Sequence, residues 1–187
     1  MKELFLTLMF FFFLNINAQK GRIVYKNNPQ LSDSLKNEIK KNPETRKEVS
    51  GMLKKFITAA PKFNYILRFD KDESLFEIES ILTKNMTEKM IMKSQSSYYT
   101  NLRTQTILEQ KEIAGTTFLI KKKAHINWEI TNEKKKIGVY LAQKAVTYKA
   151  FINTRTDKVI KHKVIAWFTP EIPINYGPDD YHSLPGL

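Results

Sequence analysis

Histidines and paired aspartates are the residues of this chain whose types could support metal binding or acid–base chemistry. His125, His162 and His182 lie in three separate segments, and none has the i, i+4 spacing or the H-E-x-x-H pattern of a metal site. Asp179 and Asp180, beside His182, could form a hard-cation or acid–base cluster, but aspartates in a Gly-Pro turn usually bond to their own backbone. We therefore predict neither a metal site nor a cofactor.

Residue types that act as nucleophiles are missing or lack their usual context. The 187-residue chain contains no cysteine, which excludes disulfides, thiol nucleophiles and cysteine-based metal sites. No serine occupies a G-x-S-x-G turn, and the 6 glycines form no phosphate-binding loop. Glu77 and Glu79 share one strand face beside a charged turn, where we expect them to be solvated. We predict no catalytic residue, and the sequence favours a non-enzymatic role.

The segment from Ala166 to Leu187 is the most distinctive part of the chain. Proline and glycine interrupt it repeatedly, so it cannot continue a helix or a central strand. Its apolar side chains are too many for a solvated tail, and we predict an ordered, extended segment laid over the core and anchored by Trp167 and Phe168. The candidate motif or partner-contact residues are Trp128, Trp167, Phe168, Pro170, Pro173, Gly177, Pro178, Pro185 and Gly186.

The N-terminus has the features of a secretory signal. Lys2 precedes a continuous apolar run from Leu4 to Leu14, and the small residue Ala18 follows a polar break. The run is shorter than the roughly 20 residues needed to span a bilayer, and no later stretch is apolar enough to cross one. We predict a signal peptide over residues 1–18, a single exported domain over 19–187 and no membrane span after signal removal. The alternative is an uncleaved N-terminal anchor.

The chain is strongly basic, with a formal charge of +12 from 31 Lys and Arg against 19 Asp and Glu. A basic chain raises the question of nucleic-acid binding. The lysines, however, fall in short separate runs such as Lys121–Lys123 and Lys134–Lys136, and no nucleic-acid motif accompanies them. We predict solvated faces and no nucleic-acid partner, with weak attraction to an anionic membrane or glycan surface as the functional interpretation.

Hydrophobic periodicity predicts the elements that must position these residues. A first strand over 21–26 precedes a pair of helices between Leu31 and Ala60, and the apolar period becomes two after Pro61. A loop or short helix is left open for Thr83–Gln95, and a turn is expected at Asn132–Lys136. The later strands are predicted at 63–69, 75–82, 97–103, 106–113, 118–123, 127–130, 138–152 and 159–169. The fold class is α+β, mainly β: an antiparallel meander or half-open curved sheet with an N-terminal helical hairpin.

The last sixty residues resemble the GLPGLI family of exported proteins from Gram-negative bacteria. The motifs that carry the resemblance are Trp128–Thr131, Lys136–Gly138, Gln143–Ala145, Ala166–Thr169, Pro170–Pro173, Gly177–Pro178 and Leu184–Leu187. Ser183 stands where the family has glycine, Ala142 where relatives often have cysteine, and the chain ends one residue before the motif's isoleucine. The resemblance implies a periplasmic, outer-membrane or extracellular location and a domain incomplete at its C-terminus. It implies no reaction.

Two classes of function remain. The first is a binding or carrier module of the cell envelope for an apolar or peptide-like ligand or an envelope protein. A curved sheet crossed by a helical hairpin, as in LolA-like periplasmic carriers, leaves an apolar groove, here lined by residues such as Phe56, Phe69 and Phe76. The alternative is an exported hydrolase, peptidase-like or glycan-active, whose catalytic residues are not identifiable.

Overall fold

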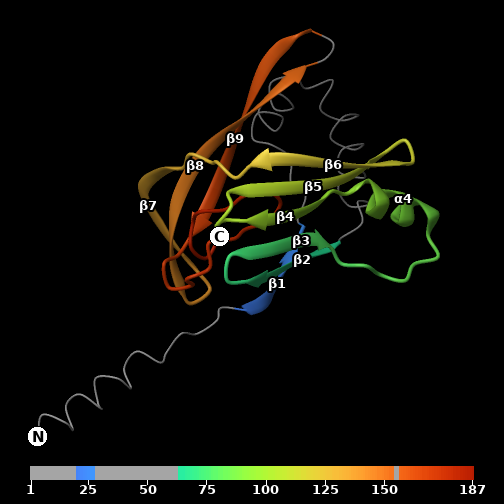
Figure 1. Ribbon diagram of the computed structural model, residues 1–187. Coiled ribbons are helices and arrows are strands. Elements are labelled where there is room, and N and C mark those ends of the chain that lie inside the picture. The colour runs from blue at the N-terminus through green and yellow to red at the C-terminus, as the bar shows by residue number, and fades with distance from the viewer. Residues whose placement is uncertain (1–19, 28–62, 154–155) are drawn as a thin grey trace, which may run out of the picture.

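The computed structural model describes residues 20–27, 63–153 and 156–187, which form two antiparallel sheets and one helix (Figure 1). In the first sheet the strands lie in sequence order: β1 (Lys20–Lys26), β2 (Asn64–Asp70), β3 (Glu73–Ile78), β4 (Ser97–Asn101), β5 (Thr106–Ile113) and β6 (Thr116–Lys123). The second sheet contains β7 (Glu129–Ile137), β8 (Tyr140–Asn153) and β9 (Lys158–Phe168). The described chain is mostly β, as predicted. The predicted helical hairpin over Leu31–Ala60 lies outside the described residues.

Period-two alternation organises the first sheet. The register pairs Ile23 of β1 with Leu67 of β2, Leu67 with Phe76 of β3, and Phe76 with Tyr98 of β4. Partners in an antiparallel register project to the same face, so these four side chains form one row across the sheet. Leu67 has no exposed surface and Phe76 is 3% exposed. We call this buried surface the inner face.

The outer face of the same sheet carries charged pairs beside the buried side chain of Ile66, which is 4% exposed. Arg22 donates to Glu79 at 2.8 Å, and Arg68 forms an ion pair with Glu77. All four side chains are partly exposed, so each pair contributes little to stability. The two glutamates that we expected to be solvated are therefore surface ion-pair partners, and β3 ends at Ile78 rather than at Leu82.

The segment before β4 forms the short helix α4 (Met86–Ser94), the second of the two alternatives left open for Thr83–Gln95. The side chain of Asn85 accepts a hydrogen bond from the backbone N–H of Glu88 at 3.3 Å, which is the N-cap arrangement. Within the described ranges, no helix reaches the length and apolarity that a membrane span requires.

The second sheet corrects one turn prediction. The lysine-rich stretch Asn132–Lys136 was expected to be a turn, but it lies inside β7, which has a bulge between Ile130 and Lys134. The turn lies instead at Gly138 and Val139, where Gly138 has a φ of 60° that favours glycine. Local polarity was misleading because an edge strand with solvated side chains can be charged throughout.

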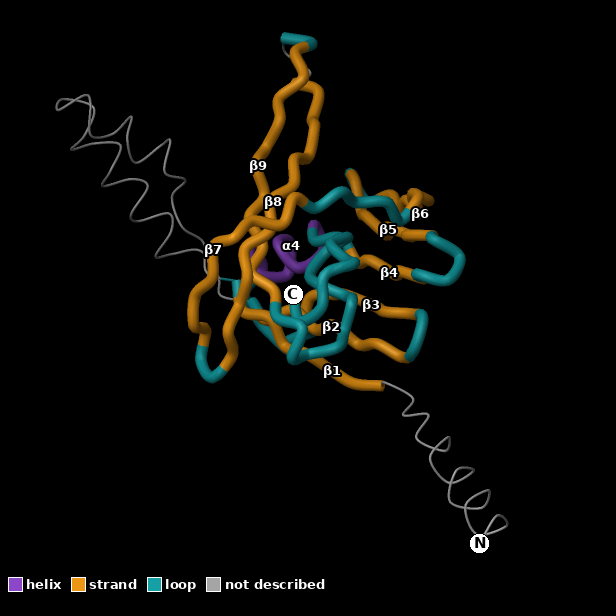
Figure 2. Tube along the Cα trace, turned by 90° about the vertical axis from the view of Figure 1, so that its left-hand side faces the viewer, coloured by secondary structure: helices purple, strands orange, loops and turns teal. Residues whose placement is uncertain are grey.

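The C-terminal segment after β9 lies between the two sheets (Figures 1 and 2). Tyr176, 4% exposed, packs with Leu67 and Phe76 on the inner face of the first sheet. Leu184, 3% exposed, packs with Ala145 and Phe168 of the second sheet. The segment is therefore the shared core of both sheets, a more central place than the surface layer that the sequence predicted.

Glycine and left-handed backbone shape the end of this segment. Gly186 has a φ of 60°, and a Cβ atom there would lie 2.7 Å from the carbonyl oxygen of Thr169 and 2.9 Å from Cβ of Ile172. Ser183, which replaces the glycine expected from the family resemblance, has a φ of 71°. Both positions adopt the left-handed region, which glycine enters without the steric cost that a Cβ atom brings.

Candidate functional site

A cleft of about 490 Å³ opens on the inner face of the first sheet. Tyr25, Tyr65, Phe76 and Tyr98 supply its aromatic surface, and the register brings these residues together from β1, β2, β3 and β4. Tyr65 and Phe76 stack in parallel with ring centroids 5.4 Å apart, while the rings of Tyr25 and Phe76 meet edge to face at 5.9 Å. The sheet thus presents a preformed aromatic surface rather than isolated rings.

Polar groups border these rings. The Tyr65 hydroxyl donates to Oε1 of Gln95 at 3.1 Å, and the Tyr25 hydroxyl donates to the carbonyl oxygen of Leu187 at 3.0 Å. Burial raises the pKa of Tyr25 to about 12, and burial followed by the Glu109 charge raises the pKa of Tyr98. These phenols therefore stay neutral at physiological pH and act as hydrogen-bond donors.

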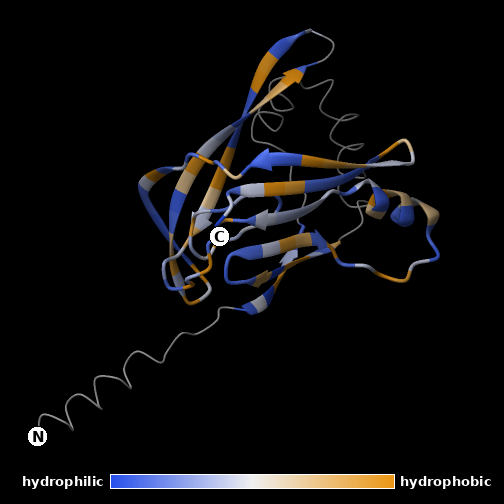
Figure 3. Cartoon of the chain, in the orientation of Figure 1, coloured by the Kyte–Doolittle hydropathy of each residue, from blue (hydrophilic) through white to orange (hydrophobic). Residues whose placement is uncertain are grey.

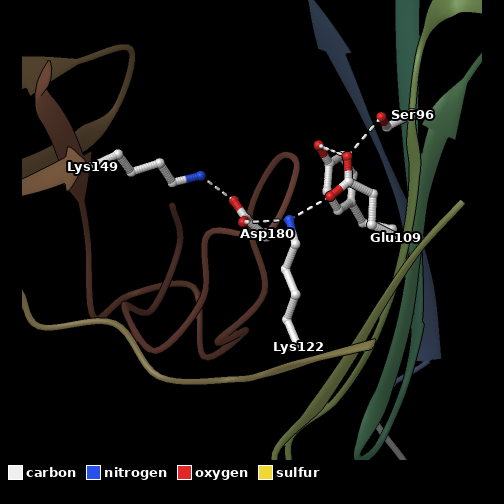
Figure 4. A network of polar contacts seen from close by, with 6 residues as sticks. Ser96, Glu109, Lys122, Lys149 and Asp180 are labelled. Atoms are coloured by element: carbon white, nitrogen blue, oxygen red, sulfur yellow. Dashed lines mark hydrogen bonds and ion pairs between the residues drawn. The ribbon is translucent and has the colours of Figure 1, made fainter. Parts of the chain in front are cut away.

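A chain of charged side chains joins the two sheets beside this cleft (Figure 4). Lys122 of β6 contacts Glu109 of β5 and lies 4.0 Å from Oδ2 of Asp180. Asp180, on the C-terminal segment, pairs through Oδ1 with Lys149 of β8. Ser96 donates to Oε1 of Glu109 at 2.9 Å. Both sheets are thus tied to the C-terminal segment by alternating charges.

The surroundings of this network shift the pKa values of Glu109 and Lys149, the residues at its two ends. The side chain of Glu109 is 9% exposed. Burial alone would raise the pKa of Glu109, but hydrogen bonds from Lys122 and Ser96 outweigh it, and the net pKa is lowered. For Lys149, burial acts to lower the pKa, but the hydrogen bond to Asp180 and the charge of Asp180 raise it by more, so the net pKa is raised. Glu109 and Lys149 therefore remain charged at neutral pH.

The aspartate pair sits at the tip of a tight loop. A bridge between Tyr176 and His182 closes this loop. Asp180 pairs with lysines rather than with its own backbone, contrary to the usual turn chemistry. Asp179 is exposed at the rim of the aromatic cleft, where partial desolvation and the Asp180 charge raise the pKa of Asp179.

The three histidines are not gathered into one site. His182 is 3% exposed, and its Nδ1 lies 2.6 Å from the hydroxyl of Ser183. His125 and His182 both line a second cavity, of about 290 Å³, where β6 approaches β8. His162 lies far along β9, where its ring meets the edge of Phe151 at 5.1 Å. Over residues 20–27, 63–153 and 156–187, no group of three or more His, Asp or Glu side chains could hold a metal ion.

The candidate motif residues split between the core and the surface. Phe168 is 7% exposed and packs with Leu184, whereas Trp167 projects to the opposite face of β9, with Nζ of Lys135 3.9 Å from its ring centroid. Trp128 Nε1 donates to the carbonyl oxygen of His182 at 2.9 Å. Of the predicted pair of anchors, only Phe168 faces the C-terminal segment. Trp128 supplies a contact to it.

The prolines and glycines of the motif have different positions. Pro178 lines the aromatic cleft, whereas Pro170 and Pro173 are exposed. The carbonyl oxygen of Pro185 accepts the backbone N–H of Thr169 at 3.0 Å. Gly177, whose N–H donates to the Tyr181 carbonyl oxygen at 2.9 Å, is packed closely enough that an added Cβ would lie 3.1 Å from Leu187. These residues build the segment, and only Pro178 reaches the cleft.

Sequence reasoning missed the ionic network. Glu109, Lys122 and Lys149 are spaced like ordinary polar residues of exposed strands. One signal was present in the alternation of β5. Glu109 lies on the same strand face as Ile107, which is 3% exposed, so the pattern placed a carboxylate on the face that is buried. A buried carboxylate requires a nearby cation or several hydrogen-bond donors. The sequence thus indicates that Glu109 has such a partner but not that the partner is Lys122.

Comparisons with known proteins identify one region. A family model described as "Protein of unknown function (Porph_ging)" matches residues 128–187. Those residues comprise the second sheet and the C-terminal segment. Neither the curated proteins nor the solved structures contain a match.

Proposed function

We propose that this protein is an exported, non-enzymatic binding or carrier module of the cell envelope whose ligand occupies the aromatic cleft. The observation that carries this proposal is a preformed cleft of about 490 Å³ with partly exposed tyrosine rings and polar side chains at its border. Ligand sites commonly combine apolar and aromatic walls with a few placed polar groups. An apolar or peptide-like ligand suits both kinds of group.

The polar border narrows the ligand chemistry. Asn27, Gln95 and Ser96 present amide and hydroxyl groups next to the rings. The charged residues that line the cleft are Lys26, Lys111 and Asp179. Amides and hydroxyls both donate and accept hydrogen bonds, which matches an extended peptide backbone. Of the residues that we expected to line a groove, Phe76 borders the cleft, Phe69 is buried in the core and Phe56 lies outside the described chain.

The proposed location and family rest on sequence features. The apolar run Leu4–Leu14 followed by Ala18 supports signal cleavage and export from a Gram-negative cytoplasm. The ordered motifs between Trp128 and Leu187 support membership of the GLPGLI family. In the C-terminal segment, the left-handed backbone at Ser183 and Gly186 gives the glycine positions of that motif a structural reason.

A binding role is favoured over a hydrolase because the two carboxylates of the ionic network, Glu109 and Asp180, are already paired with lysines. Lys122 and Ser96 hold Glu109 ionised, and Lys149 pairs with Asp180. A general acid needs a carboxyl group that retains its proton near neutral pH, and a lowered pKa opposes this. The network therefore supports structure rather than proton transfer.

Filling the cleft tests the proposal. Lys111→Trp places an indole in the cleft wall, whereas Lys121→Trp makes the same change on the exposed outer face of the first sheet. Binding of an apolar fluorescent dye, and of a labelled unstructured peptide, should weaken at least tenfold in the first variant and stay unchanged in the second. Circular dichroism and the melting temperature control for folding. Equal binding by both variants would remove the cleft as the ligand site.

Activity screening separates the two classes of function. The purified protein should be silent with generic esterase, peptidase and glycosidase substrates. Turnover that disappears on Asp180→Asn or His182→Gln would contradict the binding proposal and assign the junction between the sheets to a hydrolase.

A further inference from the structure

The outer half of the β8–β9 hairpin extends beyond the rest of its sheet. Pairing between β7 and β8 reaches only Glu129 with Val146, whereas β8 and β9 remain paired from Thr147 with Val164 to Asn153 with Lys158. This two-stranded ribbon, residues 147–153 and 158–164, is called the arm. At roughly 3.4 Å per residue, its seven pairs span about 24 Å. Figures 1 and 2 show it projecting away from both sheets.

Large apolar side chains of the arm are exposed. Ile152 is 69% exposed, Val159 62%, Phe151 52%, Ile160 42% and Tyr148 53%. Figure 3 shows the corresponding hydrophobic bands on the outer part of β8 and β9. Isolated exposed hydrophobics are ordinary, but five on one short ribbon mark a surface that a partner covers.

The register distributes these side chains over both faces of the arm. Phe151 pairs with Ile160 on one face, and Ile152 pairs with Val159 on the other. A two-stranded ribbon is marginal in water unless an apolar face is covered. A folded protein partner covers one face of a ribbon, whereas the interfacial layer of a lipid bilayer can surround both.

The charge of the arm identifies the sign of the partner. Lys158, Lys161 and Lys163 accompany the apolar pairs, and Asp157 is the single acidic residue in the described part of the turn and the two arm strands. At the inner end of the arm, Lys149 is paired with Asp180. Long lysine side chains can bury their methylenes against apolar surface and leave the ammonium at a polar interface. Tyrosine is also enriched at membrane interfaces, and Tyr148 lies at the inner end of the arm.

We propose that the arm docks on an anionic lipid surface, with its apolar pairs in the headgroup and upper acyl region and its lysines on the lipid phosphates. Apolar burial and attraction to anionic headgroups together drive this kind of interfacial binding. A second copy of the chain is a poor occupant, because two arms would bring like-charged lysines together. The ligand cleft lies on the other sheet, so lipid docking is independent of the proposed carrier role.

Vesicle sedimentation of the mature chain tests this proposal. Vesicles of mixed phosphatidylglycerol and phosphatidylcholine should bind the protein at least tenfold more tightly than phosphatidylcholine alone, and high salt should weaken the binding. Lys161→Gln with Lys163→Gln should reduce the affinity for anionic vesicles about tenfold or more, since each basic residue near such a surface contributes roughly a fivefold factor. Lys134→Gln with Lys136→Gln, an equal charge change on the exposed lysines of β7, should change it by less than about threefold.

A second pair of variants tests the apolar contribution. Ile152→Thr with Val159→Thr keeps β-branched residues in the arm but removes apolar surface, and should weaken vesicle binding about tenfold. Ile130→Thr with Val139→Thr makes a matched change at exposed positions of the β7–β8 hairpin and should leave it unchanged. Circular dichroism confirms folding in each variant. Equal binding to neutral and anionic vesicles, no binding to either, or an arm-dependent complex with an acidic protein or a second copy without lipid would overturn the proposal.

Discussion

The inner face of the first sheet and the arm of the second sheet both carry apolar side chains on antiparallel strands, but their environments are opposite. Both consist of antiparallel strands with closely spaced apolar residues, yet Leu67 in β2 has no exposed surface and Ile152 in β8 is 69% exposed. The difference lies in what covers them. Ile174 and Tyr176 of the C-terminal segment pack on the inner face. In the second sheet the segment packs on Ala145 and Phe168 and reaches the arm only at its inner end, through Asp180 and Lys149.

This comparison shows that one irregular segment decides which apolar residues stabilise the fold. Alternation places side chains on a face, but a free energy of burial arises only when another layer removes that face from water. The C-terminal segment provides this layer for both sheets at once. Substitutions of the residues that this segment covers should therefore lower the free energy of unfolding strongly. Chemically similar substitutions on the arm should leave it nearly unchanged.

The largest expected contrast is between matched truncations of Leu67 and Ile152. Leu67→Ala should lower the free energy of unfolding by about 3–5 kcal/mol, because the cavity is created in a fully buried site. Ile152→Ala should change it by less than about 1 kcal/mol. Urea denaturation monitored by circular dichroism measures both. Similar midpoints for the two variants would show that the arm is covered in solution.

Adjacent aromatic residues of β9 provide a second contrast. Phe168→Ala should cost about 3–4 kcal/mol, since Phe168 packs with Leu184 of the C-terminal segment. Trp167→Ala should cost about 1 kcal/mol, the loss of a partly exposed ring and its contact with Lys135. Thermal and urea unfolding give the two values. A larger cost at Trp167 would place the segment on the other face of β9.

A third contrast concerns backbone packing at the end of the segment. Gly186→Ala should cost about 2–4 kcal/mol, because the added Cβ would both occupy a left-handed conformation and approach the Thr169 carbonyl oxygen within 2.7 Å. Gly115→Ala is the control: its φ is 81°, but an added Cβ meets nothing within 4 Å. It should cost about 1–2 kcal/mol. Equal melting temperatures would mean that the segment can move away from Thr169.

The ionic network predicts a pH-dependent effect. The pKa of Glu109 is lowered from 4.5, so its charge stabilises the fold above that value, and this contribution is lost as the pH falls through the folded pKa. Glu109→Gln should therefore cost about 1–3 kcal/mol at pH 7, and the difference from wild type should shrink near pH 3. Glu133→Gln, which alters an exposed ion pair with Lys144, should cost less than about 1 kcal/mol. Melting curves between pH 3 and pH 7 measure both, and a constant difference over this range would contradict the assignment.

The smallest expected effect is at Ser183. Ser183→Gly removes the strain of a non-glycine residue in the left-handed region, about 1 kcal/mol. It also removes the hydroxyl that lies 2.6 Å from Nδ1 of His182. We expect a net gain of less than about 1 kcal/mol, seen as a melting temperature higher by a few degrees at most. A clear loss of stability would show that the hydroxyl contact outweighs the strain.

Much of the strand content was predictable, since β1, β2, β5, β8 and β9 follow local alternation closely. The turn between β7 and β8 was misplaced, because the charged stretch Asn132–Lys136 resembles a loop but pairs as an edge strand. The aromatic cleft was not predictable either. Its tyrosines come from separate strands, and only the register brings them together: Tyr25 pairs with Tyr65, and Tyr98 pairs with Phe76 in the next row of the same face.

By itself, the sequence determined most of the strands, the ordered C-terminal segment without regular structure, and the positions where apolar side chains alternate. These properties depend on backbone preferences and on neighbours within a few residues. The tertiary structure decided that Phe168 rather than Trp167 packs on Leu184, that Glu109 meets Lys122 near Asp180, and that the arm stays exposed. Burial and ion pairing depend on contacts between residues distant in the chain. Local periodicity identifies the apolar face of a strand but not the element that packs on that face.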